Sequence, residues 1–378
     1  MADWKSEKLK VVVSPSKLLI VTITIFSVCA IAASGAKTLD YKGPVSSHFD
    51  GERFFNPDGE VGDAGGEGRG PLQFLEMVTA HRNWPKSVPI QLSVPDARVY
   101  GNRMRITWIG HATTLLQTQG FNILIDPMWA HFDSPVQIAV RPRVRAPGVD
   151  LKKLPKIDLV LISHTHLDHL DMRALKYVYR RDRPAIVGGL GMDTLLGRHG
   201  IKAIAGDWNE RIDIEPGLNI VLNRAHHWSG RTLDDRDLVL WAGFTIVLPG
   251  GNVYYAGDSG PGKMHWAGEA KLVGPVRLAI LPIGPNFIKT PQSRYHITAA
   301  DAVTAFQQLG MPYTLGVHWG TFEMSDEPVN GARSLLEEAL WTRQIPTGRF
   351  RTLEAGEAWN VPPALSTNPL KPEGFRPL

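Results

Sequence analysis

Four side chains of the kinds that bind metal ions lie within one short stretch of the chain. His164, His166, Asp168 and His169 follow the apolar run Ile157–Ile162, which has the pattern of a buried strand. On a loop that leaves a strand, His164 and His166 can face one ion, and Asp168 and His169 can face a second. Zinc takes imidazole nitrogen and carboxylate oxygen at about 2.0–2.2 Å. The spacing therefore predicts a site for two metal ions that serves hydrolysis.

Three more candidate ligands stand at the ends of other predicted strands. His227, Asp258 and His318 each follow an apolar run, and a carboxylate such as Asp258 can bridge two ions. Plainer interpretations are a packed core residue for His227, which neighbours Trp228, and a simple turn aspartate for Asp258. His226 is expected to be a structural neighbour of the site rather than a ligand.

Composition narrows both the class of protein and the kind of metal site. Hydrophobic residues make up 43% of the 378 residues, enough for a sizeable core in one or two domains. Cys29 is the only cysteine, which excludes intrachain disulfides and cysteine-based zinc sites. The net charge of +4 is small for 378 residues and argues against a nucleic-acid-binding protein, which normally has a clustered basic surface. Arg141, Arg143 and Arg145 are expected to form a solvated arm or a contact for phosphate or lipid headgroups.

The N-terminus has the pattern of an export signal. Four lysines precede the uncharged run Leu18–Ala33, and Ser34–Ala36 offers small residues for signal cleavage. The run is short for a spanning helix, which needs about 20 residues, but Val11–Ala36 reaches that length. Residues 1–36 are therefore expected to be a signal peptide or an N-terminal membrane anchor, with a buried helix as the alternative. The lysines predict a protein anchored in the inner membrane and facing the periplasm, or secreted or periplasmic after cleavage.

The remaining chain divides into an irregular arm and a patterned body. Residues 37–98 are rich in glycine, proline and polar residues, with one short helical stretch near Leu72–Val78. The catalytic body, residues 99–378, opens on three short strands expected to form an antiparallel meander. Several later strands end in loops that carry His, Asp or Pro-Gly, which favours function at the strand ends. The predicted elements are strands over 105–109, 114–118, 121–125, 157–162, 185–187, 218–222, 252–256, 278–281 and 313–317, and helices over 172–181 and from Thr298.

The histidine-rich loop and several other stretches resemble one protein family. His164 to His169 reads H-x-H-x-D-H, the signature of the metallo-β-lactamase superfamily. The body from about Val99 to Asn360 resembles one branch of it, N-acylphosphatidylethanolamine-hydrolysing phospholipase D and its bacterial relatives. The stretches that carry this closer resemblance are Thr107–Thr113, His227–Arg231, Leu281–Gly284 and His318–Phe322, and residues 43–57 look like the arm of the bacterial members.

The resemblance implies a fold, a metal content and a set of site residues. The fold would be α/β, a four-layer αββα metallo-β-lactamase sandwich, with two Zn²⁺ per chain or another divalent metal. One zinc ion would take His164, His166 and His227. The other would take Asp168, His169 and His318, with Asp258 as the bridge. His296 matches a family histidine near the substrate phosphate, with a helix-capping role as its alternative. The catalytic residues would be Asp168, Asp258 and His296.

The resulting prediction is a zinc-dependent phosphodiesterase of the phospholipase D type. Its substrate would be N-acylphosphatidylethanolamine or a related phospholipid, attacked by a metal-bridging hydroxide. Its partners would be that phospholipid and the membrane surface, with no nucleic acid, and a homodimer is left open. One alternative is another hydrolase of the same fold, namely a lactonase, a β-lactamase or a soluble phosphodiesterase. The alternative from another class is a membrane-tethered binding protein with a relict metal site.

Overall fold

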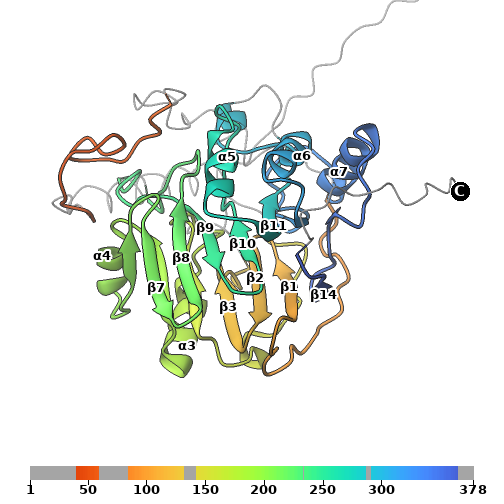
Figure 1. The fold of residues 1–378 in the computed structure, drawn as a ribbon, viewed down its shortest axis with the longest axis horizontal. Helices are drawn as coiled ribbons and strands as arrows, with labels where there is room; N and C mark the ends of the chain where they lie inside the picture. The colour runs from red at the N-terminus through yellow and green to blue at the C-terminus, as the bar shows by residue number, and fades with distance from the viewer. Residues whose placement is uncertain (1–39, 59–83, 132–141, 233, 287–290, 365–378) are drawn as a thin grey trace, which may run out of the picture.

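Two seven-stranded sheets form the centre of the described part of the protein, the first from strands within residues 104–206 and one strand at 358–361, the second from strands within residues 211–351 (Figure 1). The structure is a computed structural model, and it describes residues 40–58, 84–131, 142–232, 234–286 and 291–364. The first sheet has the order β14 (Ala358–Val361), β1 (Met104–Gly110), β2 (Thr113–Thr118), β3 (Phe121–Ile125), β4 (Leu159–Leu161), β5 (Ala185–Gly189), β6 (Ile204–Gly206). The second has the order β13 (Phe350–Arg351), β12 (Tyr313–Val317), β11 (Val276–Pro282), β10 (Asn252–Tyr255), β9 (Gly243–Val247), β8 (Leu218–Asn223), β7 (Arg211–Glu215).

The two sheets repeat one pairing pattern. In the first sheet, β14, β1, β2 and β3 pair antiparallel, and β3, β4, β5 and β6 pair parallel. In the second, β7 to β10 pair antiparallel and β10 to β13 pair parallel. The predicted antiparallel meander over residues 105–125 is therefore confirmed. Because each half repeats the pattern, the polar loops after strands of both sheets meet at one end of the molecule.

Alternating side chains give the first sheet two apolar faces. Leu159 and Leu161 pack into the core between the sheets, while Val160 packs into a second core on the other side. Leu116 and Leu115 divide in the same way. Successive residues of a strand point to opposite faces of the sheet. When both the odd and the even residues are apolar, both faces must pack against other elements. The near-continuous apolar runs of the sequence follow from this double burial.

Helices supply that cover and complete four layers (Figure 1). On the first sheet, α3 buries Leu175 and Val178 in the outer core. Its N-cap, Asp171, accepts backbone N–H bonds from the first turn. The helix predicted to begin at Thr298 is α6, and Thr298 and Asp301 exchange hydrogen bonds there in a capping box. The helices are α3 (Met172–Asp182) and α4 (Met192–Gly197) on the first sheet, α5 (His265–Leu272), α6 (Ala299–Gln308) and α7 (Gly331–Thr342) on the second, and the 3-10 turns η1 (Leu151–Lys153) and η2 (Pro291–Arg294). The αββα prediction is confirmed.

The sequence patterns did not predict the short and peripheral elements. β6 and β13 have three and two residues, too few for a periodic signal, and the predictions also missed β7, β9, β14, α4, α5 and α7. Within residues 40–58 and 84–98 the arm has no helix or strand. Residues 1–36 and the predicted helical stretch Leu72–Val78 lie outside the described residues. Among those described, no helix has the length and apolar character for a membrane crossing.

Two arginines that were expected to face solvent or phosphate are buried, and that expectation is wrong for them. Arg145 donates to Gly320 O at 3.1 Å and to Glu354 at 2.7 Å, and its guanidinium lies 5.1 Å from the Trp319 ring centre. Arg143 donates to Met128 O at 3.0 Å. Buried backbone carbonyl groups such as those of Met128 and Gly320 need hydrogen-bond donors, and one buried guanidinium supplies several. Arg141 lies outside the described residues.

Candidate metal centre

The predicted ligands meet at one end of the two sheets because each follows a strand that ends there. The histidine-rich loop follows β4, His227 follows β8, Asp258 follows β10 and His318 follows β12. Strands of both sheets therefore contribute to a single cluster in the crevice outside their carboxyl ends. The structure brings together all seven side chains that the sequence singled out.

Three histidines form the first cluster. His164 Nε2 lies 2.8 Å from His166 Nδ1, and His227 Nε2 lies 3.2 Å from the same nitrogen. Their nitrogens are near enough to one another to hold a single ion. Burial lowers the pKa of His164 and of His227 well below the usual value, and that of His166 to about 3. Neutral imidazoles are the form that ligates a metal.

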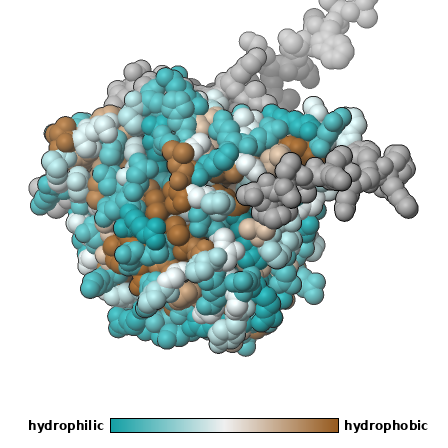
Figure 2. Space-filling view, viewed as in Figure 1, coloured by the Kyte–Doolittle hydropathy of each residue, from teal (hydrophilic) through white to brown (hydrophobic). Residues whose placement is uncertain are grey.

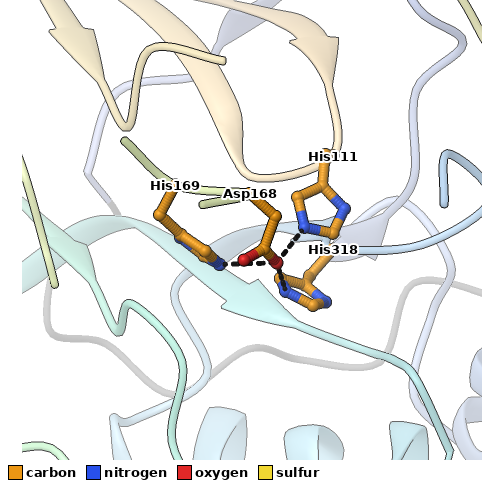
Figure 3. Close-up of side chains that lie close together, drawn as sticks. All are labelled: His111, Asp168, His169 and His318. Atoms are coloured by element: carbon orange, nitrogen blue, oxygen red, sulfur yellow. Dashed lines mark hydrogen bonds and ion pairs between the residues drawn. The ribbon is translucent and has the colours of Figure 1, made fainter. Parts of the chain in front are cut away.

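A carboxylate distinguishes the second cluster (Figure 3). Asp168 Oδ2 lies 3.5 Å from His169 Nε2, 3.4 Å from His318 Nε2 and 2.9 Å from His111 Nε2. His318 and His111 both have positive φ, at 64° and 54°, a conformation that non-glycine residues adopt rarely. The rings of these two histidines pack with centres 3.9 Å apart. Strained backbone at a polar cluster is typical of functional sites.

Asp258 lies between the two clusters. Its Oδ2 is 3.1 Å from His318 Nε2 and 3.3 Å from His169 Nε2, both in the second cluster. The same oxygen is 3.8 Å from His227 Nε2 in the first. One carboxylate thus approaches ring nitrogens of both clusters, which is the position that a bridging ligand requires.

Several buried polar atoms of the centre have no hydrogen-bond partner among the described residues. They include His169 Nε2, His318 Nε2 and both carboxylate oxygens of Asp258. Such atoms are rare in folded proteins, and an ion is one of the few things that satisfies them. All of them converge on the same small volume, so the donor set fits divalent metal ions of the kind that accept nitrogen and oxygen ligands.

Charge within the centre is divided unequally. Burial alone would lower the pKa of His169 and of His318. The nearby carboxylates of Asp258 and Asp168 outweigh this effect, and they raise the pKa of His169 well above its usual value and the pKa of His318 to about 9. Burial raises the pKa of Asp258, but His318 and His169 outweigh it and hold it well below the usual value. The two carboxylates therefore favour positive charge in the second cluster, and a bound metal cation would supply that charge.

Hydrogen bonds orient the ligand rings. Asp126 Oδ2 accepts from His169 Nδ1 at 2.7 Å and from the hydroxyls of Ser163 and Tyr255, each at 2.5 Å. Ser163 Oγ in turn lies 2.9 Å from His164 Nδ1, and Tyr295 O accepts from His227 Nδ1 at 2.8 Å. With each Nδ1 so engaged, Nε2 of these three histidines faces the metal position. Asp126 thus supports both clusters.

Two functional residues were missed when ligands were assigned from the sequence. His111 occupies the tight turn between β1 and β2, and Asp126 follows β3. Both obey the rule used for the other ligands, because each is a polar residue directly after a buried strand. Neither lies in a histidine-rich motif, so the signal was present but weaker.

The two remaining histidines of the prediction have distinct places. His296 Nδ1 lies 3.6 Å from Asp258 Oδ2, and its side chain is 11% exposed, whereas His227 and Asp258 beside it are buried. The helix cap beside it is Thr298, so the capping alternative for His296 is wrong. His226 lies 3.2 Å from Asp58 Oδ1 and belongs to none of the metal-type clusters of the described residues, as expected of a structural neighbour.

Comparison with known proteins agrees with this geometry. Residues 121–319 match the family described as Beta-lactamase superfamily domain. An uncharacterized protein of Mycobacterium tuberculosis is 33% identical over 260 residues, covering 67% of this chain and 68% of the relative. N-acyl-phosphatidylethanolamine-hydrolyzing phospholipase D 1 of Caenorhabditis elegans is 28% identical over 303 residues, covering 75% of this chain and 85% of the relative.

Two solved structures share the fold. Igni18, a metallo hydrolase from the archaeon Ignicoccus hospitalis, has a TM-score of 0.50 and 26% identity, covering 68% of this chain and 97% of that one. Isothiocyanate hydrolase from Delia radicum gut bacteria has a TM-score of 0.52 and 21% identity, covering 68% and 98%. Together with the buried His and Asp clusters, these similarities show that the chain is a metal-dependent hydrolase of the metallo-β-lactamase superfamily.

Proposed function

We propose that the protein hydrolyses the phosphodiester bond of a phospholipid, N-acylphosphatidylethanolamine or a close relative, with two zinc ions. The position of Asp258 Oδ2, close to ring nitrogens of both clusters, carries the two-metal part of the proposal. The similarity to an N-acyl-phosphatidylethanolamine-hydrolyzing phospholipase D over 75% of the chain supports the lipid part. The proposal extends a general hydrolase to a reaction of the phospholipase D type.

Each cluster would hold one ion. His164, His166 and His227 would bind the first. Asp168, His169 and His318 would bind the second. Asp258 would bridge them. When bound, two such ions supply Lewis acidity and water of lowered pKa at neutral pH.

The chain's own side chains would orient the substrate around this centre. His296 lies beside Asp258 and is partly exposed, and an N–H of its ring could donate to a phosphate oxygen that carries developing charge. Asp258 and Asp168 would hold the rings of His169 and His318 in position through the contacts described above. The balanced reaction consumes one water, whose oxygen becomes bonded to phosphorus. The headgroup leaves as an alcohol with a proton, and a phosphatidic acid remains.

Product analysis in labelled water tests the proposal directly. The full chain, loaded with zinc, is incubated with N-acylphosphatidylethanolamine in H₂¹⁸O, and the products are analysed by mass spectrometry. We expect N-acylethanolamine without label and phosphatidic acid with one ¹⁸O. Label in the alcohol, or release of a fatty acid instead, would contradict cleavage at phosphorus.

A substrate panel separates the rival hydrolases. A lactone, a cephalosporin and bis(p-nitrophenyl) phosphate are compared with the lipid at equal concentration. Faster turnover of the lactone or the cephalosporin would replace the phosphodiesterase proposal with another hydrolase of this fold. Metal analysis addresses the binding protein with a relict site, which would hold well below one zinc per chain after purification without chelator.

We also propose that residues 1–36 export the protein and that the catalytic body works outside the cytoplasm at a membrane surface. The support is the sequence pattern alone, four lysines followed by the apolar run Leu18–Ala33. Fractionation of cells with mass measurement of the mature chain would show whether the segment is cleaved or retained. A full-length protein in the cytosolic fraction would contradict export. Cross-linking at micromolar concentration would decide between a monomer and a homodimer.

A further inference from the structure

The accessible side of the metal centre is lined by two aromatic rings. Of the seven proposed ligands, six are buried and His166 alone is half-buried. The Trp228 ring packs nearly perpendicular to the His166 ring, with centres 4.0 Å apart. The Tyr295 ring lies 6.3 Å from the rings of both His227 and Trp228. Trp228 and Tyr295 are themselves half-buried, so parts of both side chains are accessible beside the half-buried His166.

A guanidinium covers these rings. Arg236 places its guanidinium carbon 4.2 Å from the centre of the Trp228 ring and 5.8 Å from that of Tyr295. Its Nη2 lies 3.4 Å from the Tyr295 hydroxyl, and its Nε donates to Asp237 Oδ2 at 3.1 Å. The side chain is 43% exposed. Stacking and the Nε bond hold the plane of the guanidinium, and Nη1 takes part in neither the Asp237 nor the Tyr295 contact.

The position of Arg236 suits a group next to the scissile bond rather than the scissile bond itself. Arg236 packs on Trp228, the ring that also contacts His166, and an arginine is not one of the proposed metal ligands. A fixed, partly exposed guanidinium recognises a carboxylate or phosphate through paired hydrogen bonds. The neighbouring aromatic faces add apolar contact for the carbon atoms that join that anion to the scissile phosphate.

We propose that Arg236, Trp228 and Tyr295 form a binding subsite for a second anionic group in the substrate's headgroup, a carboxylate or phosphate a few bonds from the scissile phosphodiester. The inference rests on the proposed function, which places that phosphodiester at the metal centre. It names a narrower substrate class: phospholipids whose headgroup carries an additional negative charge.

Two lipids that differ by one carboxylate test the subsite. N-acylphosphatidylserine and N-acylphosphatidylethanolamine are presented to the zinc-loaded full chain in identical micelles. We expect the serine lipid to have a KM about fivefold lower at similar kcat, the scale of a charge-assisted hydrogen bond at a partly exposed site. The Arg236→Gln variant should lose that preference, and Arg236→Lys should keep part of it. A preference that survives in Arg236→Gln, or none in the wild type, overturns the subsite while leaving the phosphodiesterase proposal in place.

Binding without turnover separates the two proposals. If neither lipid is cleaved, the phosphodiesterase proposal fails, and calorimetry with glycerophosphoserine and glycerophosphoethanolamine decides the subsite alone. Tighter binding of the serine compound to wild type, lost in Arg236→Gln, supports the subsite, and equal binding of the two overturns it.

Two controls distinguish recognition from a structural role of Arg236. Arg211→Gln removes another arginine, on β7, whose side chain is 55% exposed, and should leave the preference unchanged. Melting temperature and zinc content are measured for both variants. If Arg236→Gln lowers zinc content and slows both lipids equally, Arg236 only holds Trp228 in place, and the subsite is overturned.

Discussion

The two clusters of the metal centre differ in charge and in exposure. The first consists of three histidines, and its His166 is half-buried against Trp228. The second contains the carboxylate of Asp168, with His111 beside it, and every member is buried. An enclosed anionic site holds a cation more strongly than an open neutral one, because desolvation strengthens the attraction of opposite charges. We infer that the second cluster mainly retains its ion and that the first presents its ion to substrate.

The supports of the two clusters differ as well. His169 of the second cluster is held by Asp126, and the loop after His318 is held by Arg145, all within the body. His227 of the first cluster is held partly by the arm, because Asn56 Nδ2 donates to His227 O at 2.8 Å. The first cluster therefore has a support from the arm in addition to the Asp126–Ser163 contacts of the body, whereas these two supports of the second cluster lie in the body.

The largest expected effect comes from the residue common to both clusters. Asp258→Asn keeps the size of the side chain but removes the charge between the two sets of nitrogens. We expect phosphodiesterase activity to fall on the order of 10²–10³-fold, as when a group that stabilises transition-state charge is removed. Steady-state kinetics with saturating zinc measures it. Asp213→Asn, an aspartate whose side chain is 83% exposed on β7, is the matched control. Unchanged activity of Asp258→Asn would falsify the bridging role.

Removing one histidine from each cluster tests whether the two clusters retain zinc with different strength. His227→Ala should leave one zinc ion that resists dialysis against a chelator. His318→Ala should leave one that the chelator removes, because the remaining cluster is neutral and open. Metal analysis by mass spectrometry before and after dialysis gives the result. Equal retention in the two variants, or the reverse order, would contradict the comparison.

The histidine-rich loop could be predicted because its ligands are close together in the sequence. The other ligands could be predicted because the ends of buried strands can be recognised from the sequence. His164 to His169 are adjacent in sequence, so their types alone indicate a metal site. His227, Asp258 and His318 follow buried strands, and the sheet brings such ends together. The placement of Arg143 and Arg145 was not predictable in this way. Their alternation fits an exposed strand, and only distant partners, Met128 for Arg143 and Gly320 for Arg145, show why they are buried.

The pairing of His111 with Asp168 also depends on tertiary structure. The two residues are far apart in the sequence, and no local pattern connects the turn between β1 and β2 with the histidine-rich loop. Helices such as α5 were missed for another reason. α5 has no side-chain cap, and its sequence has little apolar periodicity, so the helix depends on packing against the second sheet.

His111 offers a change of intermediate size confined to the second cluster. Its Nε2 lies 2.9 Å from Asp168 Oδ2 and orients that carboxylate. We expect His111→Ala to weaken zinc binding in the second cluster about 10–100-fold, as is typical when a ligand loses its hydrogen-bond partner, and to leave the first cluster unchanged. His111→Gln, which can donate the same bond, should recover part of the affinity.

The control for His111 is a similar pair away from the metal centre. His48 Nε2 lies 2.8 Å from Asp207 Oδ1 and is also buried. His48→Ala should lower the melting temperature without changing either zinc affinity, measured by competition with a chelator of known affinity. Equal loss of affinity at both clusters in His111→Ala would assign His111 a general role in folding instead.

Asn56 provides the smallest and most selective change, because it acts on the first cluster through the arm. Asn56→Ala removes one buried donor to His227 O, which should cost about 1 kcal/mol of stability and weaken zinc in the first cluster about fivefold. Asn360 on β14 accepts an exposed hydrogen bond from Arg105 on β1, and Asn360→Ala, which removes that bond, should change neither the stability nor the zinc affinity. If Asn56→Ala lowers the affinity of the second cluster as much as that of the first, the arm supports the whole centre and the division of supports between arm and core is wrong. If only the first cluster responds, the arm tunes the ion that faces substrate while the enclosed ion stays in place.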